Sequence, residues 1–354
     1  MRSGLIFLCL ASIGLPAAPN ALAEQANSQE PLDIGSRLEL FVDDYLIESM
    51  VGVRLELHEP RSAGKVLTFD RPWEGNLSIA LGLLKHDDRY RLYYRGTSLP
   101  EYLRPSGLRT GEVLVPEHPG VFCYLESSDG IRWSRPSLGL HDFQGSQDNN
   151  IILDLEGGLG HPLLDPNPDV DSSERYKATT YQRLSESSHG LFLWVSGDGI
   201  HWRKWRQEPL FTSPLPNAFD GNQNPVFWWE PEGQYVCFFR YMLQGVRSII
   251  KTTSKDLLNW SEQVPADFGD TPLENFYVSA AHPYFRAPHI LLGVPKCLVK
   301  RRKYHSDVPH PGISDGIFMS SRDGVHWRRF MEAFIRPGRD ERNWIHRTTF
   351  TARE

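Results

Sequence analysis

The chain has 354 residues, of which 40% are hydrophobic and 23% charged, a balance typical of folded globular proteins rather than of disordered or collagen-like chains. Its formal net charge of −6 argues against a general nucleic-acid binder or a protein of anionic membrane surfaces, so we expect neither as a partner. Abundant aromatic residues, together with 29 Gly and 26 Pro, favour many short strands joined by turns.

The first residues have the pattern of an export signal. Arg2 precedes an apolar run from Leu5 to Leu15, and Ala21-Leu22-Ala23 is typical of a signal-peptidase site. The apolar run is too short to span a bilayer. We therefore predict a signal peptide over residues 1–23, a linker over 24–36, and a secreted or periplasmic mature chain.

A short motif that contains Ser and Asp and ends in Trp recurs along the rest of the chain. Its copies are residues 128–133 (SDGIRW), 196–202 (SGDGIHW), 254–260 (SKDLLNW) and 321–327 (SRDGVHW). The spacing, near 60 residues, is the size of a four-stranded propeller blade. Ser and Asp side chains can bond backbone amides in a tight turn, and Trp can pack between sheets, so we interpret the motif as a turn far from any active site.

Strand-like runs precede each copy of the motif, and hairpins are predicted for residues 80–94 and 226–240. We expect an all-β, five-bladed β-propeller over residues 37–354, with the fifth blade incomplete in this chain. Residues 37–48 are predicted to form an outer strand that closes the ring onto the last blade. The predicted blades lie near residues 74–135, 160–204, 220–262 and 274–329, with a partial fifth from 343.

Three further segments carry a resemblance to a protein family. LFVDDYLI at 40–47, DRPWEGN at 70–76 and EAFIRPG at 332–338 resemble segments of secreted, glycosidase-like propellers of planctomycete-type bacteria. The repeated motif is similar to that of five-bladed propeller glycosidases, which include arabinanases, invertases and levansucrases. The resemblance implies a propeller that acts on carbohydrate. The invertase segment Trp-Met-Asn-Asp-Pro-Asn-Gly is absent from the sequence, so catalytic residues are not carried over from that family.

Carboxylates and amides recur where the first strand of successive predicted blades begins. First strands line the channel of a propeller, so we expect these side chains to meet at one mouth. Cleavage of a glycosidic bond needs one carboxylic acid to protonate the leaving oxygen and one carboxylate as nucleophile or base. The predicted catalytic residues are Glu74, Asp220 and Glu274. The predicted substrate-binding residues are Asn76, Arg95, Asn224, Arg240, Asn275 and Arg336.

Several of these positions also have a structural interpretation. Glu74 can pair with Arg71 or Arg95, and Asp220 can cap a turn. In blade two, the equivalent place is open between residues 165–167 and residues 176–177.

A basic run at residues 296–303 stands out in an acidic chain. It is either a solvated loop or an anchor for sulfated or uronic-acid polysaccharide. The sequence contains no Gly-x-Gly-x-x-Gly, P-loop, His-Glu-x-x-His or Gly-x-Ser-x-Gly motif, so we expect no cofactor and no metal site.

The predicted function is a secreted glycoside hydrolase-like protein that acts on a polysaccharide or oligosaccharide by acid/base carboxylate chemistry. The alternatives are a non-catalytic carbohydrate-binding propeller and a structural or interaction propeller without a sugar ligand. The distance between the carboxylates of the mouth separates catalysis from binding, because hydrolysis needs a pair at a defined spacing.

Overall fold

The computed structural model divides into two compact units, residues 1–36 and 37–354, and every strand lies in the second. Two short 3₁₀ helices, Ser172–Glu174 and Glu230–Glu232, accompany the strands. Among the described residues, no helix is long and apolar enough to cross a membrane. The described residues are 31–75, 78–98, 118–155, 158–186, 188–215, 217–219, 224–302 and 312–339.

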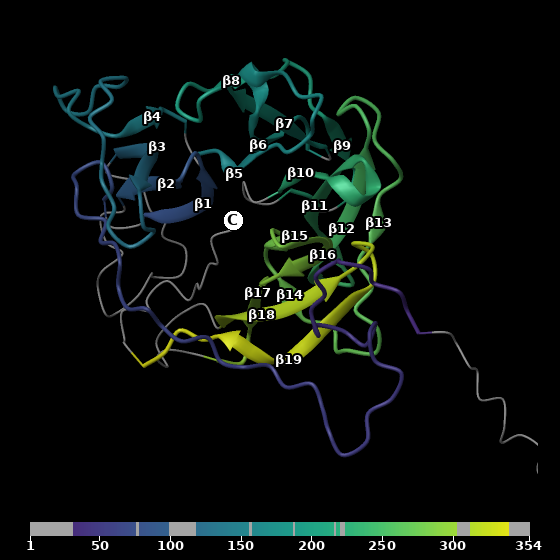
Figure 1. The fold of residues 1–354 in the computed structure, drawn as a ribbon. Helices are drawn as coiled ribbons and strands as arrows, with labels where there is room; N and C mark the ends of the chain where they lie inside the picture. The colour runs from purple at the N-terminus through teal and green to yellow at the C-terminus, as the bar shows by residue number, and fades with distance from the viewer. Residues whose placement is uncertain are drawn as a thin grey trace, which may run out of the picture. The chain divides into compact units, whose positions relative to one another are not determined.

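Four antiparallel sheets follow one another along the chain and surround a common centre, as the blades of a propeller do (Figure 1). Blade 1 contains β1 (Ile79–His86), β2 (Arg89–Ser98), β3 (His118–Ser127) and β4 (Ile151–Leu153). Blade 2 contains β5 (Gly160–Leu164), β6 (Tyr176–Arg183), β7 (His189–Ser196), β8 (Arg203–Lys204) and β9 (Phe211–Ser213).

The remaining two blades follow the same plan, with interruptions in blade 4. Blade 3 contains β10 (Val226–Trp229), β11 (Gln234–Leu243), β12 (Val246–Ser254) and β13 (Val264–Pro265). Blade 4 contains β14 (Asn275–Phe276), β15 (Ala281–Tyr284), β16 (Ala287–Gly293), β17 (Lys296–Val299), β18 (Ile313–Ser321) and β19 (Trp327–Ile335). In blade 4, β14 pairs with β17 and β15 pairs with β16. β14 and β15 together therefore take the place of the first strand of the blade, and β16 and β17 that of the second.

The predicted all-β propeller is confirmed as a class, and the described residues form four blades. The predicted fifth blade, from residue 343, lies outside the described residues and stays a prediction. The blades also extend farther along the chain than expected. Each predicted blade ended at the motif tryptophan, whereas in the structure the motif is the turn that leads from the third strand into the fourth.

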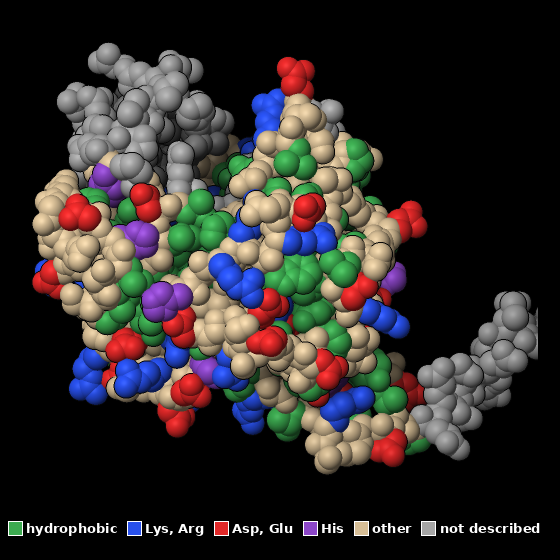
Figure 2. Space-filling model, turned by 90° about the horizontal axis from the view of Figure 1, so that it is seen from above, with side chains coloured by type: hydrophobic (Ala, Val, Ile, Leu, Met, Phe, Trp, Pro, Cys, Tyr) green, Lys and Arg blue, Asp and Glu red, His purple; other side chains and the backbone are tan. Residues whose placement is uncertain are grey.

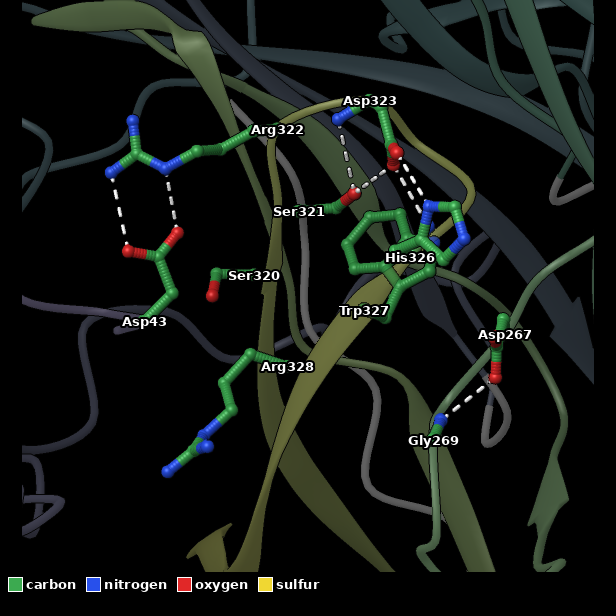
Figure 3. Close-up of a pocket in the computed structure, with 10 residues that line it drawn as sticks. All are labelled: Asp43, Asp267, Gly269, Ser320, Ser321, Arg322, Asp323, His326, Trp327 and Arg328. Carbon is green, nitrogen blue, oxygen red and sulfur yellow. Dashed lines mark hydrogen bonds and ion pairs between the residues drawn. The ribbon is translucent and has the colours of Figure 1, made fainter. Parts of the chain in front are cut away.

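The motif forms a similar turn in every blade. In blade 4, the Ser321 hydroxyl accepts a hydrogen bond from the Asp323 amide, and Oδ1 of Asp323 accepts one from the His326 amide (Figure 3). The Gly324 amide also donates to the Ser321 hydroxyl, and the Val325 amide to the same Oδ1. The same pair of amide bonds to aspartate Oδ1 recurs at positions 129, 198 and 256. The turn interpretation of the motif is therefore confirmed. In blade 1 the bonding serine is residue 127, one position earlier than expected.

Two of the motif tryptophans contact a neighbouring blade. The ring of Trp202 in blade 2 lies edge-on to Tyr93 of blade 1, with centroids 6.1 Å apart. In the same way, Trp327 of blade 4 packs on Phe238 of blade 3 at 5.6 Å. Trp327 is only 4% exposed, so its burial stabilises the boundary between these two blades.

The two faces of blade 1 pack differently because side chains alternate along a strand. Tyr93 faces blade 2, whereas Tyr94 belongs to a cluster on the opposite face. That opposite face is covered by side chains of the segment that precedes β1, including Phe69 and Trp73. Residues 67–73 are therefore a cover for blade 1.

Residues 37–48 contact blade 4, but the predicted outer strand is wrong, because the segment contains no strand. Its acidic side chains, rather than its backbone, make most of the contacts. Asp43 accepts two hydrogen bonds from the guanidinium of Arg322, and Asp44 pairs with Arg328 at 2.9 Å. Asp43, Arg322 and Arg328 border a hollow of about 350 Å³ beside the motif of blade 4 (Figure 3). The segment is held by ion pairs, whereas a closing strand would be held by backbone hydrogen bonds.

Candidate functional site

Glu74 directly follows the cover of blade 1 and is fully buried. Its Oε1 accepts hydrogen bonds from the Tyr94 hydroxyl at 2.6 Å and from Nε of Arg135 at 2.8 Å. Its Oε2 accepts from the amides of Asp70 and Arg71 and from a second nitrogen of Arg135. Burial by itself raises the pKa of a carboxyl, but the bonds from Arg135, Tyr94 and the backbone outweigh it and hold the pKa of Glu74 below its ordinary value.

This environment favours the structural interpretation of Glu74. A general acid must hold a proton near neutral pH and reach the substrate, whereas this carboxylate is stabilised as an anion and has no exposed surface. The side chain that pairs with it is Arg135, not the predicted Arg71 or Arg95. The turn that holds Glu74 requires a glycine at the next position. Gly75 has a φ of +64°, and a Cβ there would meet the Thr97 carbonyl.

Glu274 directly precedes β14 in blade 4, and 39% of its side chain is exposed. It forms an ion pair with Arg329, and the Cys297 thiol donates to its Oε2 at 3.6 Å. Burial, followed by the charge of Glu274, raises the pKa of Cys297 to about 12, so this thiol stays protonated. Of the two predicted acids that the structure describes, Glu274 is the accessible one.

The predicted convergence of the three acids stays a prediction. Asp220 lies outside the described residues. Glu74 belongs to blade 1 and Glu274 to blade 4, and no described contact joins the two carboxylates.

Two of the predicted substrate-binding residues, Asn224 and Arg240, are joined through Phe219. The Asn224 side-chain amide donates to the Phe219 carbonyl at 3.4 Å, and the Phe219 amide donates to the Arg240 carbonyl at 3.2 Å. The guanidinium of Arg240 lies 5.2 Å from the ring centroid of Tyr277, which follows β14. The contacts thus lead from the start of β10 in blade 3 to the first residues of blade 4.

Three cationic side chains surround the ring of Tyr277. Besides Arg240, the guanidinium of Arg247 lies 5.4 Å from the ring centroid and Nζ of Lys296 lies 4.4 Å from it. Oδ1 of the predicted Asn275 accepts a hydrogen bond from the Arg247 amide, and the Tyr277 amide donates to the Lys296 carbonyl at 2.8 Å. We call these five residues the Tyr277 cluster.

Strand register brings the two arginines of the cluster together. They lie on β11 and β12, which are joined by a tight turn at Gln244-Gly245 with both residues at positive φ. Arg247 pairs with Met242 across the two strands, so Arg247 and Arg240 are diagonal neighbours on the same face of the sheet. Sequence reasoning missed Arg247 and Tyr277, although the hairpin register of residues 235–254 contained the signal for Arg247.

The cluster concentrates positive charge in a partly buried place. Arg240 is 5% exposed and Lys296 is 9% exposed. Positive charges that are held near one ring repel one another. The face of an aromatic ring offsets part of this, by about 0.5–2 kcal/mol for each cation. By contrast, basic and acidic side chains are interspersed on the face of the molecule that Figure 2 shows.

No described contact joins Arg95 or Arg336 to the cluster. Arg95 lies on β2 in blade 1, where it pairs in register with Ile79 and Phe122. Arg336 follows β19 and lines a separate hollow beside Glu59. Asn76 lies outside the described residues.

The basic run at 296–303 is divided in the structure: its first residues form β17, so it is not a solvated loop as a whole, and the anchor for acidic polysaccharide stays a prediction. Lys296 belongs to the cluster, whereas Lys300 and Arg301 are exposed. Arg302 bonds both carboxylate oxygens of Asp315 at 2.6 Å and is neutralised there. Residue 303 lies outside the described residues.

The polar residues considered for blade 2 form a structural ion pair within that blade, and a hydroxyl of blade 3 joins it. Nζ of Lys177 lies 2.7 Å from Asp165, and both side chains are buried. The Tyr235 hydroxyl of blade 3 donates to the same carboxylate at 2.8 Å. Because its charge is neutralised and buried, Asp165 is unsuited to acid/base chemistry.

The inner strands of all four blades line a hollow of about 260 Å³. Its wall is largely apolar and includes Pro162, Phe227 and Trp228, with His161 and His282 among them. It provides apolar surface on the propeller axis, while the concentrated charge lies at the Tyr277 cluster.

No protein-family model matches the sequence, and a search of curated proteins gives no match. Similar solved structures include a thermostable family-43 glycoside hydrolase, at 13% identity and a TM-score of 0.43 over 75% of both chains. A glycosyl hydrolase from Bacteroides ovatus is similar at 16% identity and a TM-score of 0.44, over 80% of this chain and 81% of that one.

An N-acetylgalactosamine deacetylase from F. plautii, in complex with blood group B trisaccharide, is similar at 14% identity and a TM-score of 0.47. This match covers 80% of the present chain and 76% of the deacetylase. Likeness at these levels does not assign an activity, so function is argued from the residues of the site.

Proposed function

We propose that this chain is an exported, glycoside hydrolase-like propeller that acts on a polysaccharide or oligosaccharide where blades 3 and 4 meet. The observation that supports the proposal is the Tyr277 cluster. It combines an aromatic face with an amide and three cationic donors from two blades. Such groups suit a saccharide, because a sugar offers apolar faces to a ring and hydroxyl or acidic oxygens to donors. An acidic or sulfated saccharide is the finer proposal.

We assign the chemistry to Glu274 and Asp220. Glu274 is next to Asn275 of the cluster and is partly exposed, as a residue that contacts substrate must be. Its pairing with Arg329 suits a nucleophile or base, since both roles need a negative charge. Asp220, four residues before Asn224, then serves as the general acid that protonates the leaving oxygen.

A hydrolysis screen with the full chain tests this assignment. Neutral, uronic-acid and sulfated oligosaccharides are offered, and new reducing ends are measured. We expect Glu274→Gln and Asp220→Asn each to lower kcat by about 10²–10⁴-fold with little change in melting temperature. Glu262→Gln, the same change at an exposed residue, is the matched control and should keep full activity. Unchanged kcat in both site variants would remove the proposed acid pair.

Non-catalytic carbohydrate binding is the second candidate, and one observation favours it. Both predicted acids that the structure describes, Glu74 and Glu274, are ion-paired with arginine. Calorimetric binding of an oligosaccharide that is never cleaved, even at high protein concentration, would decide for this alternative. Export is tested separately by N-terminal sequencing of the mature protein, which we expect to begin at Glu24.

A further inference from the structure

Residues 53–57 (VRLEL) have the pattern of a strand but belong to none of the four sheets. Apolar residues at 53, 55 and 57 alternate with Arg54 and Glu56, which is the period of a strand with one apolar and one polar face. The segment follows a bend at Gly52 and contains no strand, and no backbone hydrogen bond joins it to another described residue.

The side chains of the segment are arranged as the alternation requires. Arg54 and Glu56 lie on one side, since their side chains form an ion pair at 3.0 Å and are 81% and 64% exposed. Leu55 and Leu57 between and after them are half-buried, whereas Val53 is 70% exposed. An extended, unpaired segment presents its amides and carbonyls along its edges, which makes it a template for another strand.

We propose that residues 53–57 are an interface strand through which two copies of this chain pair antiparallel about a two-fold axis at Leu55. In this pairing Leu55 lies opposite Leu55, Val53 lies opposite Leu57, and Arg54 lies opposite Glu56 of the second copy. The two-fold axis produces each of the last two contacts twice. All apolar side chains are then on one face of the pair, and both ion pairs are on the other.

Other registers of self-pairing are unfavourable. A shift by two residues sets Arg54 opposite Arg54 or Glu56 opposite Glu56, and like charges directly opposite each other are destabilising. A shift by one residue sets charged side chains opposite apolar ones on both faces. The segment therefore provides its own complement in a single register, which is why we assign a second copy as its partner rather than a different protein.

The size of the contact determines how strong the dimer is. Five paired residues on each copy bury less than the roughly 1,200 Å² of a stable protein–protein interface. We therefore expect a reversible dimer with a Kd of about 10⁻⁵–10⁻³ M. Sedimentation equilibrium of the full chain over a range of protein concentrations measures it.

Two charge reversals identify the strand and its register. Arg54→Glu sets two carboxylates opposite each other, and Glu56→Arg sets two guanidinium groups opposite each other. Each turns two attractions into two repulsions, so we expect each variant alone to weaken dimerisation by at least about 10-fold. An equimolar mixture of the two variants, or the double variant, restores opposite charges and should restore the dimer. Arg301→Glu and Glu262→Arg reverse the same charges at exposed positions outside the segment and should not change the Kd.

Hydrogen exchange of residues 53–57 provides the second measurement. We expect their amides to exchange rapidly when the protein is dilute and more slowly at concentrations where the dimer forms. Protection that does not depend on concentration would show that the strand is paired within one copy, and it overturns the proposal. A chain that stays monomeric up to millimolar concentration also overturns it, as does a dimer that both charge reversals leave intact. Failure of the mixed variants to associate overturns the register. None of these results depends on hydrolysis, so the inference and the proposed function are tested separately.

Discussion

The Glu74 centre of blade 1 and the Tyr277 cluster of blades 3 and 4 are both charged and partly or fully buried, but the first is built around a carboxylate and the second around an aromatic ring. At Glu74, one arginine, a tyrosine and two amides satisfy one carboxylate. At Tyr277, three cations share one aromatic ring, and a buried nitrogen of Arg247 has no acceptor among the described residues. The Glu74 carboxylate is therefore fully satisfied within the fold, whereas Arg247 has a buried donor without a described acceptor.

The largest expected effect comes from removing the carboxylate of the Glu74 centre, and it is on the stability of the protein. Glu74→Ala leaves the Arg135 guanidinium, the Tyr94 hydroxyl and two amides without their acceptor. We expect a loss of about 3–5 kcal/mol in the free energy of unfolding, because one partner of a buried pair is removed. Urea denaturation measures it, with the exposed Glu262→Ala as the control. A loss below about 1 kcal/mol would contradict the structural role of Glu74.

The titration of Glu74 provides a second test of its structural role, through the pH dependence of stability. The pKa of Glu74 is lower in the folded protein than in the unfolded chain, so the unfolded state takes up this proton first on acidification. The stabilisation from Glu74 is complete above about pH 5 and is lost as the pH falls through the pKa of the folded state. We expect Glu74→Gln, which cannot titrate, to show a shallower loss of stability below about pH 5 in denaturation series. An unchanged slope would show that Glu74 does not control acid unfolding.

The smallest expected effect is at the Tyr277 cluster. Arg247→Gln removes one of three neighbouring positive charges and loses one cation–π contact. These changes oppose each other, so without ligand we expect stability to stay the same or rise by up to about 1 kcal/mol. Urea denaturation at low salt measures it. A loss above about 2 kcal/mol would show that Arg247 supports the fold in the manner of Arg135 and would end the contrast between the two centres.

The propeller could be predicted from local signals. The motif that ends at Trp133, Trp202, Trp260 and Trp327 recurs at blade length, and its Ser and Asp side chains bond amides within a few residues. Hairpins such as β10–β11 were visible from alternating apolar residues and a turn. These features depend on neighbours close in sequence, which is why one sequence suffices to find them.

The partners of the charged side chains were decided by the tertiary structure. Glu74 pairs with Arg135, 61 positions later, and Asp43 pairs with Arg322, 279 positions later. The local pattern suggested instead a nearby partner for Glu74 and a strand for residues 37–48. The sequence by itself determined the blade repeat and its turns, because those bonds are short-range. Only the tertiary structure decided which carboxylates are neutralised and where positive charge collects, because residues from different strands and blades must meet before their charges balance.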